Sequence, residues 1–354
     1  NKGSEIEVLD SEEKVGGLCR SETKDGFVFD IGGGHIIYSK DKKILKFMLK
    51  HIGKGNIVQH KRNTKIFYKG RYVKYPFENG LNDLPKEDNF ACLIGYIKAH
   101  YARQNKGPNE PENFKEWIIW RFGEEIANRF MFPYNERLWK VDLATMDVDW
   151  VQGRVPDAPL EAAVRAALGL PSEGYIHQAT FYYPVSKGIQ GFVDTIAAPI
   201  KGDIKVSTPV TSVEKKGEKW MVNGGEYDAI VSTIPLHELV RVLKNADNKI
   251  KRAVSQLKYI SIATFLIGLD EPTTKPYSWV YLPHKQHGCC HRVTWLSNYS
   301  PNNAPQGKSS LLAEVTYLGN TELKIDDGYV KPVSYTHLRA HETSLHLVCR
   351  LLLE

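Results

Sequence analysis

Hydrophobic residues form two kinds of pattern along the chain. They recur at helical spacing over residues 41–51, 84–130, 160–168 and 236–243, so these segments are predicted to be helices. They alternate, or run continuously over short stretches, in the segments predicted to be strands: residues 5–10, 65–75 (a hairpin), 206–213, 220–222, 229–234, 260–269, 279–282 and 311–316. The mixture predicts an α/β fold with a helical insertion and a separate antiparallel β-sheet.

Residues at the ends of three predicted helices support these boundaries. Gly53 follows the first helix, where a glycine commonly ends one. Asn113 and Glu116 have the spacing of a loose capping box in front of an apolar face. Pro159 opens the helix at 160–168 and Gly169 closes it.

The composition is that of a globular protein. The chain has 354 residues, of which 42% are hydrophobic and 25% charged, and this length indicates two or three domains. The longest clean apolar stretch, Ile260–Leu269, has about half the length that a membrane-spanning helix needs, so no membrane span is predicted.

Charge and cysteine content limit the classes of binding partner and the cellular compartment that the sequence indicates. Lys and Arg (47) exceed Asp and Glu (41), which gives a net charge of +6 without a long basic run. Nucleic-acid binding is not predicted, because no basic stripe interleaves with aromatic residues. The small excess favours anionic small molecules. Five cysteines without a regular spacing indicate reduced thiols in a cytoplasmic protein.

The last segment, residues 333–354, differs in character from the rest of the chain. It contains His337, His341, His346 and Cys349, which are residue types that bind zinc. Their surroundings, however, resemble translated sequencing-adapter sequence. We therefore expect a non-native tail here and predict no metal site.

The N-terminal segment has the features of the second half of a dinucleotide-binding unit. A predicted strand ends at Asp10, whose carboxylate is placed to accept hydrogen bonds from a ribose. The first strand and the G-x-G-x-x-G turn of such a unit would lie about 20 residues earlier. We therefore expect the chain to be truncated at this end.

Three consecutive glycines, Gly32 to Gly34, follow an extended apolar stretch and precede His35. Glycines have no Cβ and so allow the backbone to approach a ligand closely. The same run also suits a hinge between a strand and a turn, and the residues alone leave both interpretations open.

Several motifs taken together resemble the UDP-galactopyranose mutase family, in particular its longer branch. The resemblance covers residues 5–320 and is carried by Asp10-Ser-x-Glu-x-x-Gly-Gly-Leu18, Gly26-Phe-x-Phe-Asp-x-Gly…His35, Tyr75-Pro-Phe77…Leu84-Pro-Lys-Glu-Asp88, Phe130-Met-x-Pro-Tyr-Asn135…Trp139 and Ser297-Asn-Tyr-Ser-Pro301. The glycine and histidine motifs are shared with amine oxidases and related flavoproteins. The Pro-Tyr-Asn…Trp and Ser-Asn-Tyr-Ser-Pro motifs are more specific.

The resemblance implies a flavin-dependent isomerase that interconverts UDP-galactopyranose and UDP-galactofuranose. In that family the N5 atom of reduced FAD attacks the anomeric carbon and displaces UDP. The resulting flavin N5–sugar adduct opens, the sugar recloses as the other ring, and UDP returns. The resemblance also implies NADPH as the reductant and a UDP-sugar as the substrate, and a homo-oligomer is compatible with it.

Matching positions imply which residues serve this chemistry. Catalytic roles are implied for His35, Arg154 and Arg292. FAD-binding roles are implied for Asp10, Ser11, Gly16, Gly17, Leu18, Gly33, Gly34, His35 and Val210. Substrate-binding roles are implied for Tyr75, Phe77, Glu78, Phe130, Tyr134, Asn135, Trp139, Arg154, Gln178, Trp279, Tyr281 and Arg292.

The chemistry of these side chains suits the implied substrate. The guanidinium groups of Arg154 and Arg292 can each present two aligned donors to a diphosphate. Aromatic side chains such as Phe77 and Phe130 suit stacking on uracil, and they suit ordinary core packing equally well.

The sequence also departs from the family pattern. Glu78 stands where the family usually has Gln, and an ionised carboxylate accepts but does not donate hydrogen bonds, so base recognition is expected to differ. Three glycines precede His35 instead of two, and one extra residue lies between Trp279 and Arg292. The family's final section, with a further arginine, active-site tyrosines and a last FAD contact, is missing.

These features predict a division into domains. A Rossmann-like FAD-binding domain without its first βα unit is expected from residues 1–60 and 187–258. A mainly helical substrate domain is expected at 77–180. An antiparallel sheet domain is expected from 61–76, 181–186 and 259–332, before the tail at 333–354.

Two other functions remain open. An FAD-dependent oxidoreductase of the amine oxidase or protoporphyrinogen oxidase type shares the fold but binds no diphosphate, so Arg154 and Arg292 discriminate between the two enzymes. The third is a fragment without activity that binds neither FAD nor substrate.

Overall fold

The computed structural model describes residues 3, 5–105, 111–151, 154–155, 158–171, 179–200, 202–319, 321 and 323, together with the backbone of 351–353. Its helices are α1 (Lys42–Ile52), α2 (Lys86–Asn105), α3 (Phe114–Ile126), α4 (Phe132–Trp139), α5 (Leu160–Ala167), α6 (Gln190–Ala197), α7 (Leu236–Val242) and α8 (Asn248–Ser255). Its strands are β1 (Glu7–Leu9), β2 (Ser21–Lys24), β3 (Phe27–Asp30), β4 (Ile57–Lys61), β5 (Thr64–Tyr68), β6 (Arg71–Lys74), β7 (Thr180–Pro184), β8 (Asp203–Lys205), β9 (Val213–Lys216), β10 (Lys219–Val222), β11 (Gly225–Tyr227), β12 (Ile260–Leu269), β13 (Trp279–Tyr281), β14 (Arg292–Thr294), β15 (Ser309–Leu318) and β16 (Leu351–Leu353). The predicted α/β class is confirmed.

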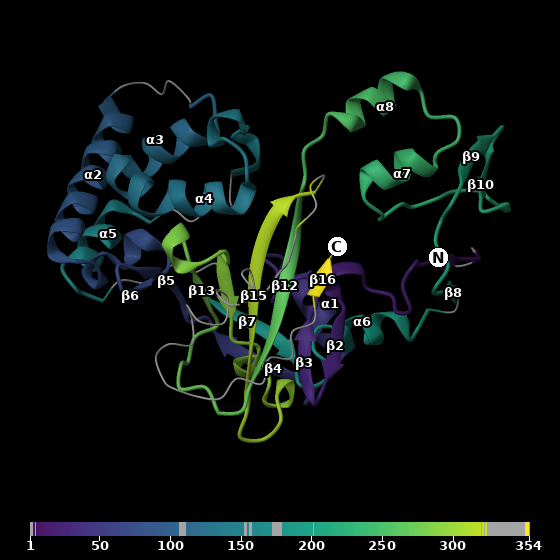
Figure 1. The fold of residues 1–354 in the computed structure, drawn as a ribbon, viewed down its shortest axis with the longest axis horizontal. Coiled ribbons are helices and arrows are strands. Elements are labelled where there is room, and N and C mark those ends of the chain that lie inside the picture. The colour runs from purple at the N-terminus through teal and green to yellow at the C-terminus, as the bar shows by residue number, and fades with distance from the viewer. Residues whose placement is uncertain are drawn as a thin grey trace.

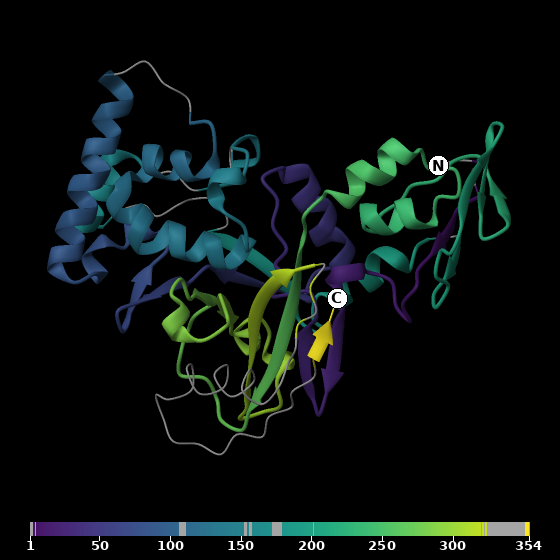
Figure 2. The same ribbon diagram turned by 45° about the horizontal axis from the view of Figure 1, so that its top comes forward.

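Three bodies lie next to one another (Figure 1). Helices α2 to α5 gather on one side of the sheet that contains β12 and β15, and β9, β10, α7 and α8 lie on the other side, near the N-terminus. The turned view keeps the two outer bodies apart (Figure 2). No helix among the described residues is long and apolar enough to cross a membrane.

The large sheet has the strand order β16-β12-β15-β14-β13-β5-β6 within the described residues. β12 and β15 pair antiparallel along their whole length, from Ile260 opposite Leu318 to Leu269 opposite Ser309. β13 runs parallel to β5, so the sheet is mixed at that point. The neighbouring residues Phe265 and Leu266 pack into different buried clusters, which means that both faces of β12 are covered.

One strand lies outside the sheet to which it was expected to belong. Residues 181–186 were grouped with the antiparallel sheet domain, but β7 pairs with β4, from Ile57 opposite Pro184 to Lys61 opposite Thr180. These two strands form a separate two-stranded sheet.

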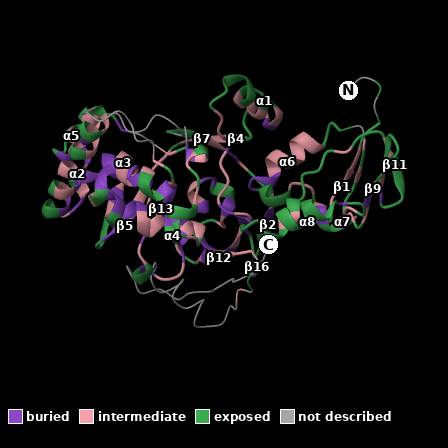
Figure 3. Cartoon of the chain, turned by 90° about the horizontal axis from the view of Figure 1, so that it is seen from above, coloured by how far each residue is buried: buried purple, intermediate pink, exposed green. Residues whose placement is uncertain are grey.

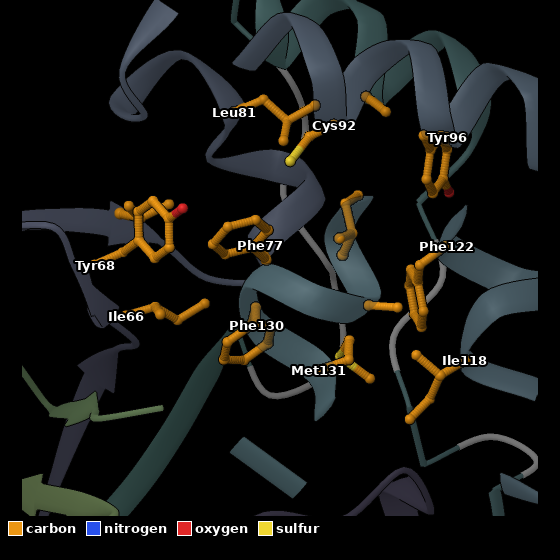
Figure 4. Packing of buried hydrophobic residues seen from close by; sticks show 14 of the residues in the cluster. Ile66, Tyr68, Phe77, Leu81, Cys92, Tyr96, Ile118, Phe122, Phe130 and Met131 are labelled. Atoms are coloured by element: carbon orange, nitrogen blue, oxygen red, sulfur yellow. The ribbon is translucent and has the colours of Figure 1, made fainter. Parts of the chain in front are cut away.

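The helical body encloses the largest group of buried aromatic and aliphatic side chains. Figure 4 shows Phe77 and Phe130 facing each other inside it, with Tyr96 and Phe122 from α2 and α3 beyond them. α2 and α3 approach closely at Gly95 and Gly123, where a Cβ on Gly123 would lie 2.5 Å from the Gly95 carbonyl oxygen. The backbone at Gly123 has a φ of 79°, so a glycine is required there on two counts.

Several local predictions are confirmed. The predicted helix at 41–51 is formed as α1 and ends at Gly53 as predicted, while the cap that Asp41 provides by accepting from the N–H groups of Lys43 and Ile44 is seen only in the structure. The Asn113 side chain accepts from the Glu116 N–H at the start of α3. The predicted hairpin is formed by β5 and β6.

Two strand predictions are wrong. Residues 206–213 do not form one strand, because Ser207 has a φ of 50° and its N–H donates to the Glu12 carbonyl, which turns the chain. Residues 229–234 form no strand and pair with none among the described residues, and Val231 is 92% exposed. A strand needs a hydrogen-bonded neighbour, which the apolar pattern alone does not supply.

The contact between α2 and α3 gives a stability prediction. We expect Gly123→Ala to lower the free energy of unfolding by about 3 kcal/mol or more, because the methyl group clashes with the Gly95 carbonyl in addition to the strain at positive φ. Urea unfolding followed by tryptophan fluorescence measures the loss.

Gly217→Ala is the matched control. Gly217 has a φ of 58° but has no atom within 4 Å of the added Cβ, so only the backbone strain of about 1 kcal/mol is expected. Equal losses in the two variants would contradict the close-contact explanation.

Candidate functional site

Aromatic side chains from the large sheet and the helical body meet in one continuous group. Its members are Tyr75, Phe77, Phe130, Tyr134, Trp279 and Tyr281, which we call the aromatic wall. The ring centroids of Phe77 and Phe130 lie 5.2 Å apart with nearly parallel planes. Those of Tyr134 and Tyr281 lie 4.9 Å apart, edge to face. The structure therefore brings together six aromatic residues predicted for the substrate site.

The members of the aromatic wall differ in accessibility. Phe77 and Phe130 are buried, at 0% and 4% exposure, and they belong to the core of the helical body. Their burial agrees with ordinary core packing, one of the two roles that the sequence left open for them. Tyr75, Tyr134 and Tyr281 are only partly buried, so these three tyrosines are the aromatic side chains that a ligand can contact.

An arginine that the sequence analysis did not select lies against the aromatic wall. The Arg62 guanidinium lies 5.0 Å from the centroid of the Tyr75 ring and 5.8 Å from that of Trp279. A cation over an aromatic face is attracted by the ring quadrupole. The only sequence signal is the basic run Lys61-Arg62 next to β5, which resembles ordinary surface charge.

Arg292 is held by a buried glutamate. Its Nε donates to Glu314 Oε1 at 2.8 Å and its Nη2 donates to Glu314 Oε2 at 2.5 Å, so the pair is bidentate. Glu314 is fully buried on β15, whereas the Arg292 side chain is 28% exposed. Burial lowers the pKa of Arg292, but the charge and hydrogen bonds of Glu314 outweigh this and raise it. Arg292 is therefore a fixed, permanent cation.

The glycine run has two different environments. A Cβ on Gly32 would lie 2.7 Å from the Leu18 carbonyl oxygen, and a Cβ on Gly34 would lie 2.8 Å from a methyl carbon of Thr294. These two glycines are needed because the chain packs against itself. Gly33, with a φ of 105°, lies next to the Arg292–Glu314 pair, and a Cβ added to it would lie 3.5 Å from Arg292 Nη2.

His35 and Asp30 form a second part of the site. Asp30 is fully buried, and its carboxylate accepts from Ser21 Oγ, Tyr183 OH, Ile189 N and His35 N, at distances of 2.7, 2.8, 3.1 and 3.3 Å. Burial raises the pKa of Asp30, and these donors oppose that shift. His35 Nε2 is buried without a partner in the described part of the chain.

The N-terminal candidates lie around the end of β1. β1 runs parallel to β8, and Asp10 follows it with a carboxylate that accepts from the Glu12 N–H. The Thr208 N–H donates to the Asp10 carbonyl, which brings the segment before Val210 alongside. Positive φ values occur at Gly16 and Gly17. Ser11 and Leu18 are exposed.

Among the described residues, the side chains of the remaining candidates make no contact with Arg292. Arg154 is exposed, and its backbone N–H donates to the Val151 carbonyl. Asn135 donates to the Met131 carbonyl. Trp139 contacts Trp150, with ring centroids 5.2 Å apart. Gln178 lies outside the described residues.

Glu78 is buried in the helical body rather than exposed to a ligand. It is 3% exposed, and its Oε1 has no partner among the described residues. Burial raises the pKa of Glu78 to about 7, and the Arg121 charge opposes this only in part. A neutral carboxyl group carries a donor as well as acceptors, which reduces the difference from Gln that its charged form implies.

The described residues contain no group of three or more His, Cys, Asp or Glu side chains that could hold a metal ion. Four cysteines within them, Cys19, Cys92, Cys289 and Cys290, are free thiols.

The model of the family of flavin-containing amine oxidoreductases matches residues 1–329. The chain belongs to this family. Its flavoprotein fold agrees with the predicted fold class, and the strand, glycine run and His35 that precede the helical body are the part of the chain on which that prediction depended.

Similar proteins of known structure extend the comparison. A crystal structure of reduced UDP-galactopyranose mutase is 27% identical, with a TM-score of 0.81, and the match covers 98% of this chain and 75% of that one. The predicted resemblance to that family is thereby confirmed. A protein of Exiguobacterium sp. 255-15 assigned to the protoporphyrinogen oxidases shares the fold at 16% identity, with a TM-score of 0.69 and coverages of 99% and 80%.

One curated relative is a dTDP-fucopyranose mutase of Escherichia coli, which is 21% identical over 142 residues. The matched region is 39% of this chain, and it spans only about a third (36%) of that relative's length.

The burial of Glu78 generates a pH prediction. The pKa is near 4.5 when the chain is unfolded and about 7 when it is folded, so the folded state binds more protons between these values and stability falls as pH rises through this window. We expect Glu78→Gln to raise the free energy of unfolding by roughly 2–3 kcal/mol at pH 8 and by much less at pH 4.5. Urea unfolding at both pH values measures this difference. Glu218→Gln, in an exposed turn, serves as the control, and a gain that does not depend on pH would contradict the explanation.

The Asp30 network generates a second prediction. Asp30→Asn replaces one acceptor oxygen by an N–H₂ group that opposes the N–H donors around it, and we expect a loss of roughly 2–4 kcal/mol in the free energy of unfolding. Thermal and urea unfolding check this value. The matched control is Asp25→Asn in the exposed β2–β3 turn, where φ is 50° and Asn is tolerated, so almost no change is expected.

Proposed function

We propose that this chain is a flavin-dependent isomerase that interconverts UDP-galactopyranose and UDP-galactofuranose. The proposal is supported by the 27% identity to a reduced UDP-galactopyranose mutase over nearly the whole chain. The curated relative is also named as a mutase of a nucleotide sugar.

The observation that carries the proposal is the position of Arg292. Its guanidinium is fixed by Glu314, lies beside Gly33 in the glycine run, and comes from the strand next to the one that carries Tyr281. A guanidinium held in place next to partly buried tyrosines suits a nucleotide diphosphate, because the N–H donors that Glu314 does not use need no reorganisation when the anion arrives. Arg62, against Tyr75 and Trp279, supplies a second cation on the same wall.

The residues that are present fit an FAD molecule. His35 Nε2 is a buried polar atom without a partner, and Asp10 follows a strand of a parallel pair, where a carboxylate can bind a ribose. Asp10, Ser11, Gly16, Gly17, Leu18, Gly33, Gly34, His35 and Val210 are the residues that we assign to FAD binding. When bound in its reduced form, FAD supplies the nucleophile for the anomeric carbon, and NADPH is the proposed reductant.

The protein's own groups then have separate tasks. Arg292 and Arg154 bind the diphosphate and stabilise the charge that develops on it as a leaving group. Tyr75, Tyr134 and Tyr281, with Asn135, Trp139 and Gln178, enclose the sugar and exclude water. His35 holds the glycine loop in place through its N–H bond to Asp30.

We further infer a cytoplasmic location for this activity. The free thiols of the four described cysteines agree with a reducing compartment.

The direct test uses the full chain loaded with FAD and reduced by dithionite under anaerobic conditions. Incubation with UDP-galactofuranose should give UDP-galactopyranose, separated by chromatography. An apoprotein without flavin absorbance after loading would contradict the cofactor assignment. Hydrogen peroxide release from an amine, without sugar conversion, would contradict the isomerase and support the oxidase.

The role of Arg292 gives a kinetic prediction. Arg292→Lys keeps a positive charge beside Glu314 but removes the bidentate fork, so kcat/KM for the UDP-sugar should fall by about 100-fold while the flavin spectrum is retained. Arg241→Lys is the control, because Arg241 is exposed on α7 and pairs only with Glu238. Equal activity of the two variants would remove the argument for the diphosphate site.

A further inference from the structure

The positive charge of the chain is concentrated around α1. Residues 40–54 contain six lysines and one aspartate, a local excess of five charges, whereas the whole chain has a net charge of +6. Lys42, Lys46, Lys50 and Lys54 recur every four residues, so they follow one side of the helix and the turn after it. We call these four residues the lysine face.

The lysine face is not neutralised by the protein. No acidic side chain among the described residues pairs with any of its four members or with Lys43. Elsewhere lysines do find carboxylates, as Lys205 does with Glu7 and Lys308 with Asp270. What distinguishes α1 is the density of its lysines, six against one aspartate within residues 40–54.

Large apolar side chains are exposed beside these lysines. Ile44 is 52% exposed and Phe47 is 53% exposed, and both belong to α1. The Phe47 ring contacts only the His51 ring among the aromatic residues, with centroids 4.4 Å apart. About half of each of these two side chains is exposed, which leaves apolar surface on one short helix in contact with water.

The helix itself is rigidly presented. Leu45, Met48 and Leu49 pack on a buried cluster whose members include Ile52, and Asp41 caps the N-terminus. Figure 3 shows α1 at the edge of the molecule, coloured mainly as exposed and intermediate. A partner therefore binds an amphipathic helix that is already folded, so binding requires no free energy for helix formation.

The shape of this surface selects the kind of partner. The depression on α1 is lined only by residues 42–54, namely Lys42, Leu45, Lys46, Leu49, Lys50, Gly53 and Lys54. No second element forms an opposite wall, so a small anion would be held from one side only. Lysines flanking exposed apolar side chains on a convex helix suit a flat, anionic and deformable surface.

We propose that α1 attaches the protein peripherally to the surface of a membrane that contains anionic lipids. The ammonium groups of the lysine face lie at the level of the lipid headgroups, and Ile44 and Phe47 enter the boundary between the headgroups and the acyl chains. This association is independent of the proposed isomerase activity.

The test is flotation of the full chain with vesicles. Vesicles of phosphatidylcholine with about 30% phosphatidylglycerol should carry the protein, and phosphatidylcholine vesicles should not. The triple variant Lys42→Glu, Lys46→Glu, Lys50→Glu should lose at least about tenfold in affinity for the anionic vesicles. Phe47→Ser should weaken binding at about 0.5 M salt, where screening leaves the apolar contribution.

A charge-matched control separates a local site from a general charge effect. The variant Lys24→Glu, Lys86→Glu, Lys98→Glu changes three exposed lysines away from α1 by the same total charge and should bind as the unmodified chain does. Circular dichroism checks that every variant is folded. Absence of flotation with anionic vesicles, equal loss in the control variant, or binding to soluble polyglutamate instead of vesicles would each overturn the proposal.

Discussion

A single buried carboxylate fixes the arrangement on which the site depends. Asp30 accepts hydrogen bonds from β2, β7, the start of α6 and the loop that carries His35, and the donors lie up to 159 residues from Asp30 in the sequence. An unpaired carboxylate would be costly in this interior, so the four donors must stay in place around it. This hydrogen-bond network therefore fixes the position of the glycine run between Asp30 and His35.

A second buried carboxylate, that of Glu314, lies near the glycine run. Glu314 is fully buried in β15 and is compensated by Arg292, whose side chain reaches towards solvent. Gly33 lies close to this pair, since a Cβ added to it would lie 3.5 Å from both Arg292 Nη2 and Glu314 Oε2. Asp30 therefore fixes the glycine loop and Glu314 fixes the guanidinium of Arg292. The partly exposed tyrosines lie beside that guanidinium.

Local structure was predictable from the sequence where the deciding interactions are local. The Asp41 cap, the Asn113 cap and the β5–β6 hairpin depend on residues within a few positions of one another. The failure at 229–234 has the opposite cause, since pairing depends on a distant neighbour. For the same reason Arg292 was predicted from the resemblance, but its partner Glu314 on the neighbouring strand was not. Arg62 gave no signal beyond a short basic run, because its contact with Trp279 spans 217 residues.

Residues 229–234, which pair with no strand in the described structure, bear on the self-association of the chain in concentrated solution. Their backbone N–H and C=O groups are not engaged by a strand in the described structure, and Val231, Ile234 and Leu236 are exposed at 92%, 39% and 54%. Such a segment is a template on which an extended stretch of another polypeptide can add by main-chain hydrogen bonding. Residues 229–236 are therefore the segment at which we expect self-association of this chain to begin, and a competing extended peptide should suppress it.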